Sequence, residues 1–111
     1  MKNAQNLFIR LAMLLSLIIG FSSSGLQAKE KAVVLYSTSW CSYCKQVRDF
    51  LKSEGVAYVD YDIENSEEAK RKFQAAHGQG VPLIFVGQTR LEGFDRQQLK
   101  AELLKQGIIK R

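Results

Sequence analysis

The fold of this chain is decided by the stretch AVVLYSTSWCSYC, residues 32–44, which joins an apolar run to the only two cysteines. Residues 32–36 form a continuous β-branched and apolar run, which predicts a buried strand. Cys41 and Cys44 follow at once, where helical spacing of apolar residues begins. Residues three apart on a helix share one face, so the two sulfurs can form a small disulfide ring. This placement suggests redox chemistry at a strand-to-helix junction.

Cys41 is the candidate nucleophile of this pair. The first turn of a helix has unpaired backbone N–H groups and the positive end of the dipole, which favour a thiolate at Cys41. Lys45 and Arg48 on the same helix could add positive potential, although surface lysines usually face solvent. The C-x-x-C spacing by itself leaves open half of a zinc site and a structural disulfide. A loop this short stabilises a fold little, which counts against a purely structural disulfide.

A metal site is not expected in this chain. His77 is the only histidine, and it is remote in sequence from the two cysteines. Two cysteines and one histidine fall short of a zinc site, which usually has three or four protein ligands. The same isolation of His77 counts against a Cys-His hydrolase, because no group is identified that would orient the imidazole.

The rest of the chain predicts further strands and helices in a regular order. The first strand, helix and second strand predict a right-handed crossover with parallel pairing, and a Gly-X pair predicts a two-residue hairpin turn. The predicted elements are a helix over residues 42–54 closed by Gly55, a strand over 56–61, a helix capped by Asn65 or Ser66 and stopped by Gly78, strands over 83–86 and 89–92 joined by Gly87-Gln88, and a last helix capped by Asp95 that runs to Gly107.

This order, β-α-β-α-β-β-α with a dithiol at the first strand-to-helix junction, resembles the thioredoxin fold in its smallest form, the glutaredoxins. The resemblance extends over residues 33–104 and rests on three motifs in order, which are the Cys41 to Cys44 pair, Val81-Pro82 and Gly93-Phe94-Asp95. It implies an α/β fold with a mixed four-stranded sheet flanked by helices. It also implies a thiol–disulfide oxidoreductase in which Cys41 attacks a substrate sulfur and Cys44 resolves the mixed disulfide.

The resemblance further implies a binding surface for glutathione or an extended peptide. In this family a cis X-Pro bond lies against the dithiol and frees the preceding backbone groups for substrate, a role that falls to Val81 and Pro82. The Gly-aromatic-Asp segment holds the γ-glutamyl end of glutathione, which points to Gly93, Phe94 and Asp95. Asp95 could serve equally as a helix cap.

Two positions depart from the family pattern. Arg96 stands where a second acid often follows the first, and Thr38 stands where many members carry Lys or Arg. Both positions touch the charged ends of glutathione, so weak glutathione recognition is expected. Trp40 before the first cysteine looks more like thioredoxin, whereas Tyr43 lies inside the motif as in many glutaredoxins. These two aromatic residues are the other candidate substrate contacts. Their flat rings suit a protein surface as well as a tripeptide.

Residues 1–28 have the pattern of a signal peptide, which leaves residues 29–111 as the predicted glutaredoxin-like domain. Lys2 and Arg10 precede an apolar run over residues 11–21, and small residues lead to a cleavage site after Ala28. That run is about half as long as the roughly 20 residues that span a bilayer. We therefore expect an exported, periplasmic protein without a stable membrane span after cleavage.

Composition narrows the classes of partner. The 111 residues are 46% hydrophobic, enough for one domain with its own core. Without Lys2 and Arg10 the formal net charge falls from +5 to +3. The remaining basic residues are scattered among acidic ones, so a nucleic acid partner is not indicated. We expect a monomer with no bound cofactor, and with glutathione as co-substrate beside protein thiols and disulfides.

Two alternatives stay open at this stage. One is a glutathione-dependent iron–sulfur cluster-binding module, because some glutaredoxins hold a cluster between two subunits and Ser42 replaces the more usual proline. The other is a thioredoxin-like reductase or oxidase of protein disulfides that does not use glutathione. The sequence leaves the net direction of exchange undecided.

Overall fold

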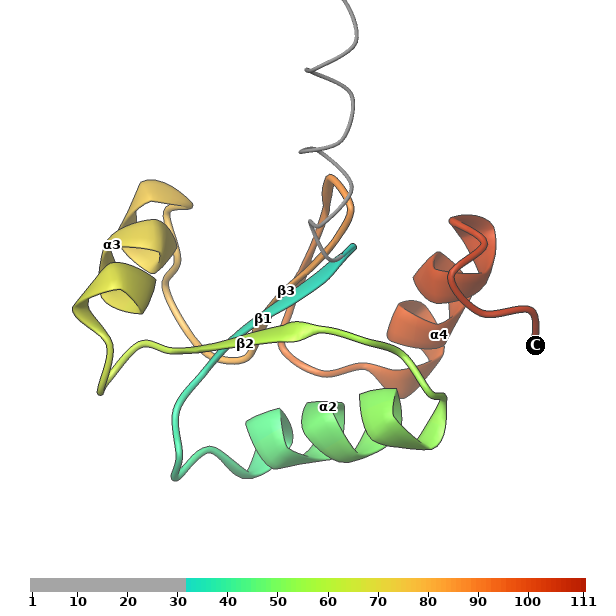
Figure 1. The fold of residues 1–111 in the computed structure, drawn as a ribbon, viewed down its shortest axis with the longest axis horizontal. Helices are drawn as coiled ribbons and strands as arrows, with labels where there is room; N and C mark the ends of the chain where they lie inside the picture. Colours follow the sequence, from blue (N-terminus) through green and yellow to red (C-terminus); the bar gives the residue numbers. More distant parts are fainter. Residues whose placement is uncertain (1–31) are drawn as a thin grey trace, which may run out of the picture. The chain divides into compact units, whose positions relative to one another are not determined.

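The computed structural model describes residues 32–111, and these follow the predicted order of elements. The elements are β1 (Val33–Ser37), α2 (Ser42–Ser53), β2 (Val59–Asp62), α3 (Glu67–Ala75), β3 (Leu83–Val86), β4 (Thr89–Glu92) and α4 (Arg96–Lys105). The strands form one sheet in the order β2-β1-β3-β4 (Figure 1). β1 runs parallel to β2 and antiparallel to β3, and β3 is antiparallel to β4. The mixed four-stranded α/β fold is confirmed; the predicted signal peptide lies outside the described residues.

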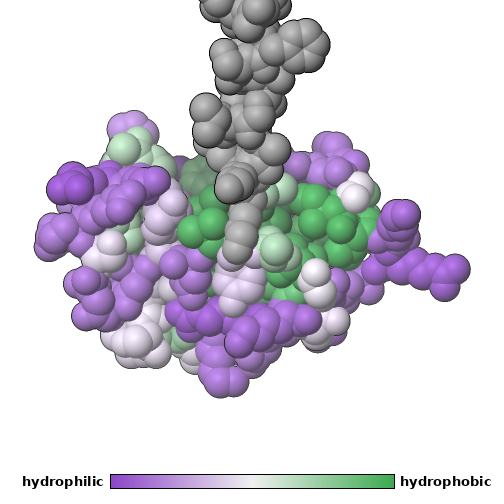
Figure 2. Space-filling model, viewed as in Figure 1, coloured by the Kyte–Doolittle hydropathy of each residue, from purple (hydrophilic) through white to green (hydrophobic). Residues whose placement is uncertain are grey.

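The sheet carries α2 and α4 on one face and α3 on the other (Figure 1). Val33 and Leu35 of β1 are fully buried in a core to which α2 and α4 contribute but α3 does not. Tyr36, the next residue along the strand, faces the other side of the sheet, and its ring centroid lies 5.8 Å from that of Phe73 in α3. Only Ala69 of α3 is buried, and polar residues cover much of the surface around this helix (Figure 2). The core between the sheet and helices α2 and α4 consists of Val33, Leu35, Val47, Phe50, Leu51, Val56, Ile84, Val86, Leu91, Leu99, Leu103 and Ile109.

The second strand is shorter than predicted. Instead of running over residues 56–61, it begins at Val59. The reason lies in how α2 ends: Gly55 takes a left-handed φ of 68°, and the N–H groups of Gly55 and Val56 donate to carbonyls of the last helical turn. This is the Schellman arrangement, in which the residue after the glycine also packs on the helix. Val56 is therefore buried in closing α2 and cannot pair with β1.

The second helix also ends earlier than its glycine suggests. Ser66, rather than Asn65, is the cap, and its hydroxyl accepts the N–H three residues on at 3.1 Å. His77 with φ 56° takes the left-handed position expected of Gly78, whose N–H donates to the Phe73 carbonyl at 2.9 Å. A Cβ on Gly78 would clash with the Phe73 ring, so close approach rather than φ favours glycine there.

The hairpin and the last helix form as predicted. Val86 pairs with Thr89 across the two-residue turn, where Gly87 has a φ of 58°. Asp95 caps α4 by accepting the Gln98 N–H at 3.1 Å. None of the helices within residues 32–111 is both long and apolar enough to cross a membrane.

Candidate active site

The strand register brings the three sequence motifs to one end of the sheet. Tyr36 pairs with Leu83, so the end of β1 lies beside the start of β3, directly after Pro82. Leu83 pairs with Glu92, and the Gly93 N–H donates to the Pro82 carbonyl at 2.9 Å. We call this region the site end of the sheet. It comprises the β1–α2 junction with Cys41 and Cys44, the segment Val81-Pro82 and the segment Gly93-Phe94-Asp95.

The two cysteines form a disulfide, with Cα atoms 5.2 Å apart. Cys41 is the N-cap of α2, one residue before the helix begins, and its Sγ accepts the Cys44 N–H at 3.1 Å. Cys44 is fully buried and Cys41 is 7% exposed, so of the two residues only Cys41 reaches the surface. Once the bond is reduced, the same N–H group and the helix dipole stabilise a thiolate on Cys41.

Exposed aromatic side chains flank Cys41. Trp40 precedes it and Tyr43 follows it, and both are largely exposed. Together with Leu104 they are the exposed large hydrophobic side chains of the described part of the chain. Apolar rings beside a reactive sulfur provide contact area for a partner that presents a disulfide.

The Val81-Pro82 segment offers free backbone beside a hollow. Its peptide bond is cis, Pro82 is buried and Val81 is half-buried. Neither the N–H nor the C=O of Val81 makes a hydrogen bond to another residue in 32–111, so both can pair with an extended substrate. The adjoining hollow of about 300 Å³ is lined by Gln79, Gly80, Val81, Pro82, Glu92 and Gly93. The sequence motifs did not indicate Gln79 or Glu92; the hairpin register could have indicated Glu92.

Gly93 and Phe94 of the Gly93-Phe94-Asp95 segment line different hollows. Gly93 lines the hollow beside Val81, whereas Phe94 turns toward α2 and packs its ring 6.2 Å from that of Phe50. Asp95 uses one carboxylate oxygen to cap α4, which is one of its two predicted roles. Phe94 belongs to a second hollow of about 360 Å³, lined by Gln46, Asp49, Phe50, Ser53, Phe94 and Arg96. The structure therefore brings Gly93, but not the Phe94 ring, to Val81.

The two departures from the family pattern have clear places in the structure. Thr38 is only 3% exposed, and its hydroxyl is a buried side-chain oxygen without a hydrogen-bond partner among the described residues. A short buried hydroxyl therefore occupies the position where a long cation is common. Arg96 is exposed at the start of α4, with its guanidinium 5.2 Å from the Phe50 ring centroid.

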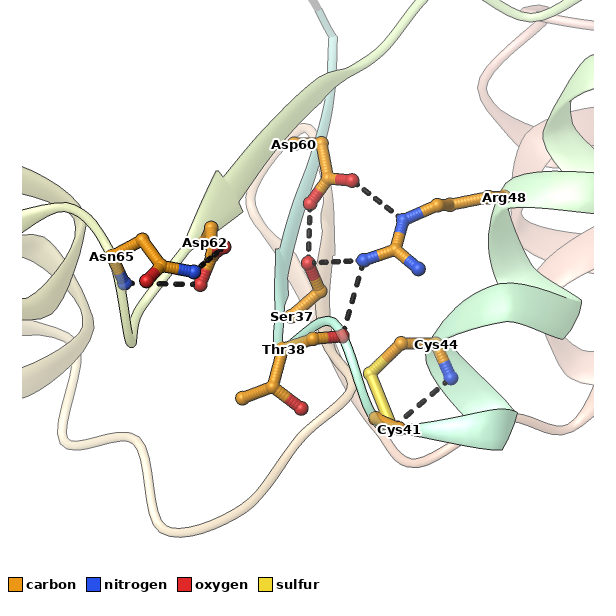
Figure 3. A network of polar contacts seen from close by, with 8 residues as sticks. All are labelled: Ser37, Thr38, Cys41, Cys44, Arg48, Asp60, Asp62 and Asn65. Atoms are coloured by element: carbon orange, nitrogen blue, oxygen red, sulfur yellow. Dashed lines mark hydrogen bonds and ion pairs between the residues drawn. A yellow bond between two sulfur atoms is a disulfide. The ribbon is translucent and has the colours of Figure 1, made fainter.

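A polar network lies beside the disulfide (Figure 3). The Arg48 guanidinium donates from Nε to Asp60 Oδ2 at 2.7 Å, and from Nη2 to Ser37 Oγ at 2.7 Å and the Thr38 carbonyl at 3.3 Å. The Ser37 hydroxyl donates to Asp60 Oδ1 at 2.5 Å. We name these residues, Ser37, Arg48 and Asp60, the Arg48 network. It joins α2, β1 and β2 at the site end of the sheet.

Two of the basic residues of α2, Lys45 and Arg48, thus differ in their surroundings. Lys45 is exposed and pairs with Asp49 at 2.8 Å, on the solvent side of the helix. Arg48 is partly buried and bonded to two strands. The sequence did not indicate Asp60 or Ser37, although a serine that ends a buried apolar strand is a signal that could have been followed.

No metal site is apparent within the described range. No three side chains of His, Cys, Asp or Glu gather there in a way that could hold an ion. His77 lies at the end of α3 in the left-handed position that closes the helix. Its role within residues 32–111 is thus tied to the backbone turn.

Comparisons with known proteins agree on one family. The glutaredoxin family model matches residues 33–91. The chain is 35% identical over 82 residues to a glutaredoxin of Neisseria meningitidis serogroup A, which covers 71% of this chain and 96% of that protein. A crystal structure of a glutaredoxin from Archaeoglobus fulgidus superimposes with a TM-score of 0.60 and 28% identity, over 68% of this chain and 88% of that chain. The buckwheat glutaredoxin-glutathione complex shares the fold with a TM-score of 0.55 at 20% identity, over 68% and 74% of the two chains.

Proposed function

The chain belongs to the glutaredoxin family and is a thiol–disulfide oxidoreductase, and on that premise we propose that it exchanges disulfides with glutathione mixed disulfides and with protein cysteines through Cys41. The observation that carries this proposal is the difference between the two sulfurs. Cys41 keeps 7% of its surface exposed at the N-cap of α2, whereas Cys44 is fully buried one turn deeper. A nucleophile must be accessible, while a resolving thiol needs only to reach its neighbour.

The exchange proceeds in two displacement steps. The Cys41 thiolate attacks one sulfur of a substrate disulfide, which forms a mixed disulfide and releases the other sulfur as a thiolate. Cys44 then loses its proton and attacks Cys41 Sγ, which re-forms the Cys41–Cys44 disulfide and releases the second substrate sulfur. The protein dithiol loses two electrons and two protons, and the substrate disulfide gains them. The disulfide state of the structure is the product of this second step.

The reverse sequence oxidises a substrate dithiol and leaves Cys41 and Cys44 reduced. For either direction to repeat, an external thiol or disulfide must restore the starting state. In the reducing direction glutathione or a second protein dithiol can do so, and in the oxidising direction glutathione disulfide or a protein disulfide can do so. The relative potentials of these couples set the net direction.

Support for glutathione use comes from the hollow beside Val81. Unpaired backbone groups of Val81 can hold the central part of an extended tripeptide, and Gly93 lines the same hollow. Against strong binding, no cation stands at Thr38 and a cation stands at Arg96. We therefore propose glutathione recognition that is real but weak.

Replacement of Arg96 by aspartate tests this point. Because Arg96→Asp restores the second acid of the family pattern, it should improve turnover of a glutathionylated peptide severalfold, as expected when an exposed ion pair contributes on the order of 1 kcal/mol. The measurement is KM and kcat on a glutathionylated peptide, with reduction of a protein disulfide that contains no glutathione as the reference reaction.

Arg96→Gln is the matched control, since it removes the cation without adding an acid. We expect a smaller gain than for Arg96→Asp, in KM rather than in kcat. If wild type and both variants fail to turn over the glutathionylated peptide while reducing the protein disulfide, glutathione is not a substrate. The chain would then act as a thioredoxin-like partner of protein disulfides.

We also propose that the protein works outside the cytoplasm, in the periplasm. The support is the signal-peptide pattern of residues 1–28, together with a compartment in which disulfides persist. Intact-mass analysis of the protein from its native compartment should give a chain that begins near Lys29. Recovery of the full-length chain from the membrane fraction would contradict cleavage.

A further inference from the structure

The Arg48 network holds the backbone that leads into Cys41. The Thr38 carbonyl, three residues before Cys41, accepts from Arg48 Nη2, and Ser37 before it is fully buried. The Ser37 hydroxyl is satisfied twice, as a donor to Asp60 and as an acceptor from Arg48. Both oxygens of the Asp60 carboxylate are engaged, so the guanidinium has a defined orientation.

The same arginine belongs to the helix that follows Cys41. Cys41, Cys44 and Arg48 are spaced three and then four residues apart, which places them on one face of α2. The chain is therefore held on both sides of Cys41 by one side chain, from within α2 and through the Thr38 carbonyl (Figure 3). These contacts limit how far the β1–α2 junction can move when the disulfide is reduced.

We propose that Arg48 is a positioning residue for the Cys41 thiol, which it holds through the Thr38 carbonyl while Asp60 balances its charge beside the dithiol. The inference rests on the proposed function, because it concerns the reactive sulfur of that same site. It adds three residues, Ser37, Arg48 and Asp60, to those on which the exchange reaction depends.

The other charged groups around the site end of the sheet have partners of their own. Hydrogen bonds from the Asn65 side chain and the Glu64 N–H hold the pKa of Asp62 below its usual range. A hydrogen bond from Lys45 likewise lowers the pKa of Asp49. Burial, and next the charge of Asp60, raise the pKa of Tyr58; Glu92 pairs with Arg90, and Asp95 caps α4. Arg48 of the network is thus the charged side chain that is hydrogen-bonded to the backbone leading into Cys41.

Two charge-changing variants should shift the pH midpoint of Cys41 thiolate formation in opposite directions. Asp60→Asn keeps the shape of the carboxylate but leaves Arg48 uncompensated, so the pH midpoint of Cys41 thiolate formation should fall by about half a unit. Arg48→Gln leaves Asp60 uncompensated, so the midpoint should rise by about the same amount. Both variants break the ion pair, and a merely structural role would move the two midpoints in the same direction or not at all. Ultraviolet absorbance of the thiolate, in a Cys44→Ser background, gives the midpoint without any substrate.

A third variant isolates positioning from charge. Arg48→Lys keeps the positive charge but cannot supply the planar fork that reaches Asp60, Ser37 and the Thr38 carbonyl together. Its thiolate midpoint should stay near that of wild type, while the rate of disulfide exchange should fall about threefold and the junction amides should exchange hydrogen faster. Lys45→Gln, the loss of one exposed positive charge on the same helix, is the matched control and should leave the rate and the amide exchange unchanged.

These measurements separate failure of this inference from failure of the proposed function. Midpoints that move in the same direction, or that do not move, in Asp60→Asn and Arg48→Gln would overturn the charge balance. An Arg48→Lys rate and amide exchange no different from those of Lys45→Gln would overturn positioning. The proposed function is tested instead by turnover of the wild-type protein, which neither the thiolate midpoint nor the amide exchange requires.

Discussion

Cys41→Ser should abolish disulfide exchange with every substrate, to the level of the reaction without protein. The reason is that the Cys44 sulfur is fully buried, so no second thiol in the described domain can take over attack on a substrate. A serine hydroxyl at the same N-cap keeps the hydrogen bond to the backbone but does not ionise at neutral pH. The measurement is turnover of a glutathionylated peptide and of a protein disulfide, with circular dichroism to show that the fold is kept.

Cys44→Ser is the matched variant, and its effect should depend on the substrate. Reduction of protein disulfides should be lost because the mixed disulfide at Cys41 is no longer resolved from within the protein. Some turnover of glutathione mixed disulfides should remain, since free glutathione can resolve that intermediate. Trapped mixed disulfides should accumulate on Cys41 in the native compartment, where mass spectrometry would identify the partners. Equal and complete loss on both substrates would argue against a glutathione-dependent route.

The second large effect is expected in the core. Leu103→Ala should lower the free energy of unfolding by about 2–5 kcal/mol, because the leucine is fully buried and its removal leaves a cavity. That is a large share of the roughly 5–15 kcal/mol by which proteins of this kind are stable. Leu103 holds α4 against the sheet, and α4 begins at the Asp95 cap next to Gly93. Urea unfolding of the purified domain measures the change.

Leu104→Ala, one position along the same helix, is the control for this effect. Its side chain is 40% exposed, so the loss of stability should be under about 1 kcal/mol. The two variants remove the same atoms and differ in burial. A loss at Leu103 no larger than that at Leu104 would show that α4 is not docked as the structure describes.

The sequence by itself determined the elements whose signals are local. The apolar run before Cys41 predicted β1, the helical spacing of Val47, Phe50 and Leu51 predicted the buried face of α2, and the Gly-X pair predicted the β3–β4 turn; the structure confirms each of them. These signals are local because side-chain periodicity, turn chemistry and capping act within a few residues of the chain. The dithiol was found for the same reason, since both cysteines lie within one helical turn.

Other features were decided only by packing between distant segments. The sequence could not show that Val56 closes α2 instead of starting β2, because that choice depends on which apolar residues the core takes up. Nor could it show that Phe94 turns to Phe50 while Gly93 stays beside Pro82. Both residues lie between β4 and α4, so their neighbours depend on how that connection packs against the rest of the fold.

The Arg48 network illustrates the same limit at the site. Its members Ser37, Arg48 and Asp60 lie on three different elements, and their sequence spacing has no fixed meaning. They meet because β1 and β2 pair in parallel, which sets Ser37 and Asp60 on the face that α2 covers. The sequence determined that Cys41 and Cys44 form a dithiol at the start of a helix, whereas the tertiary structure decided which charges surround it. Hydrogen bonds between side chains act over about 3 Å, and only the folded sheet brings residues so distant in sequence within that range.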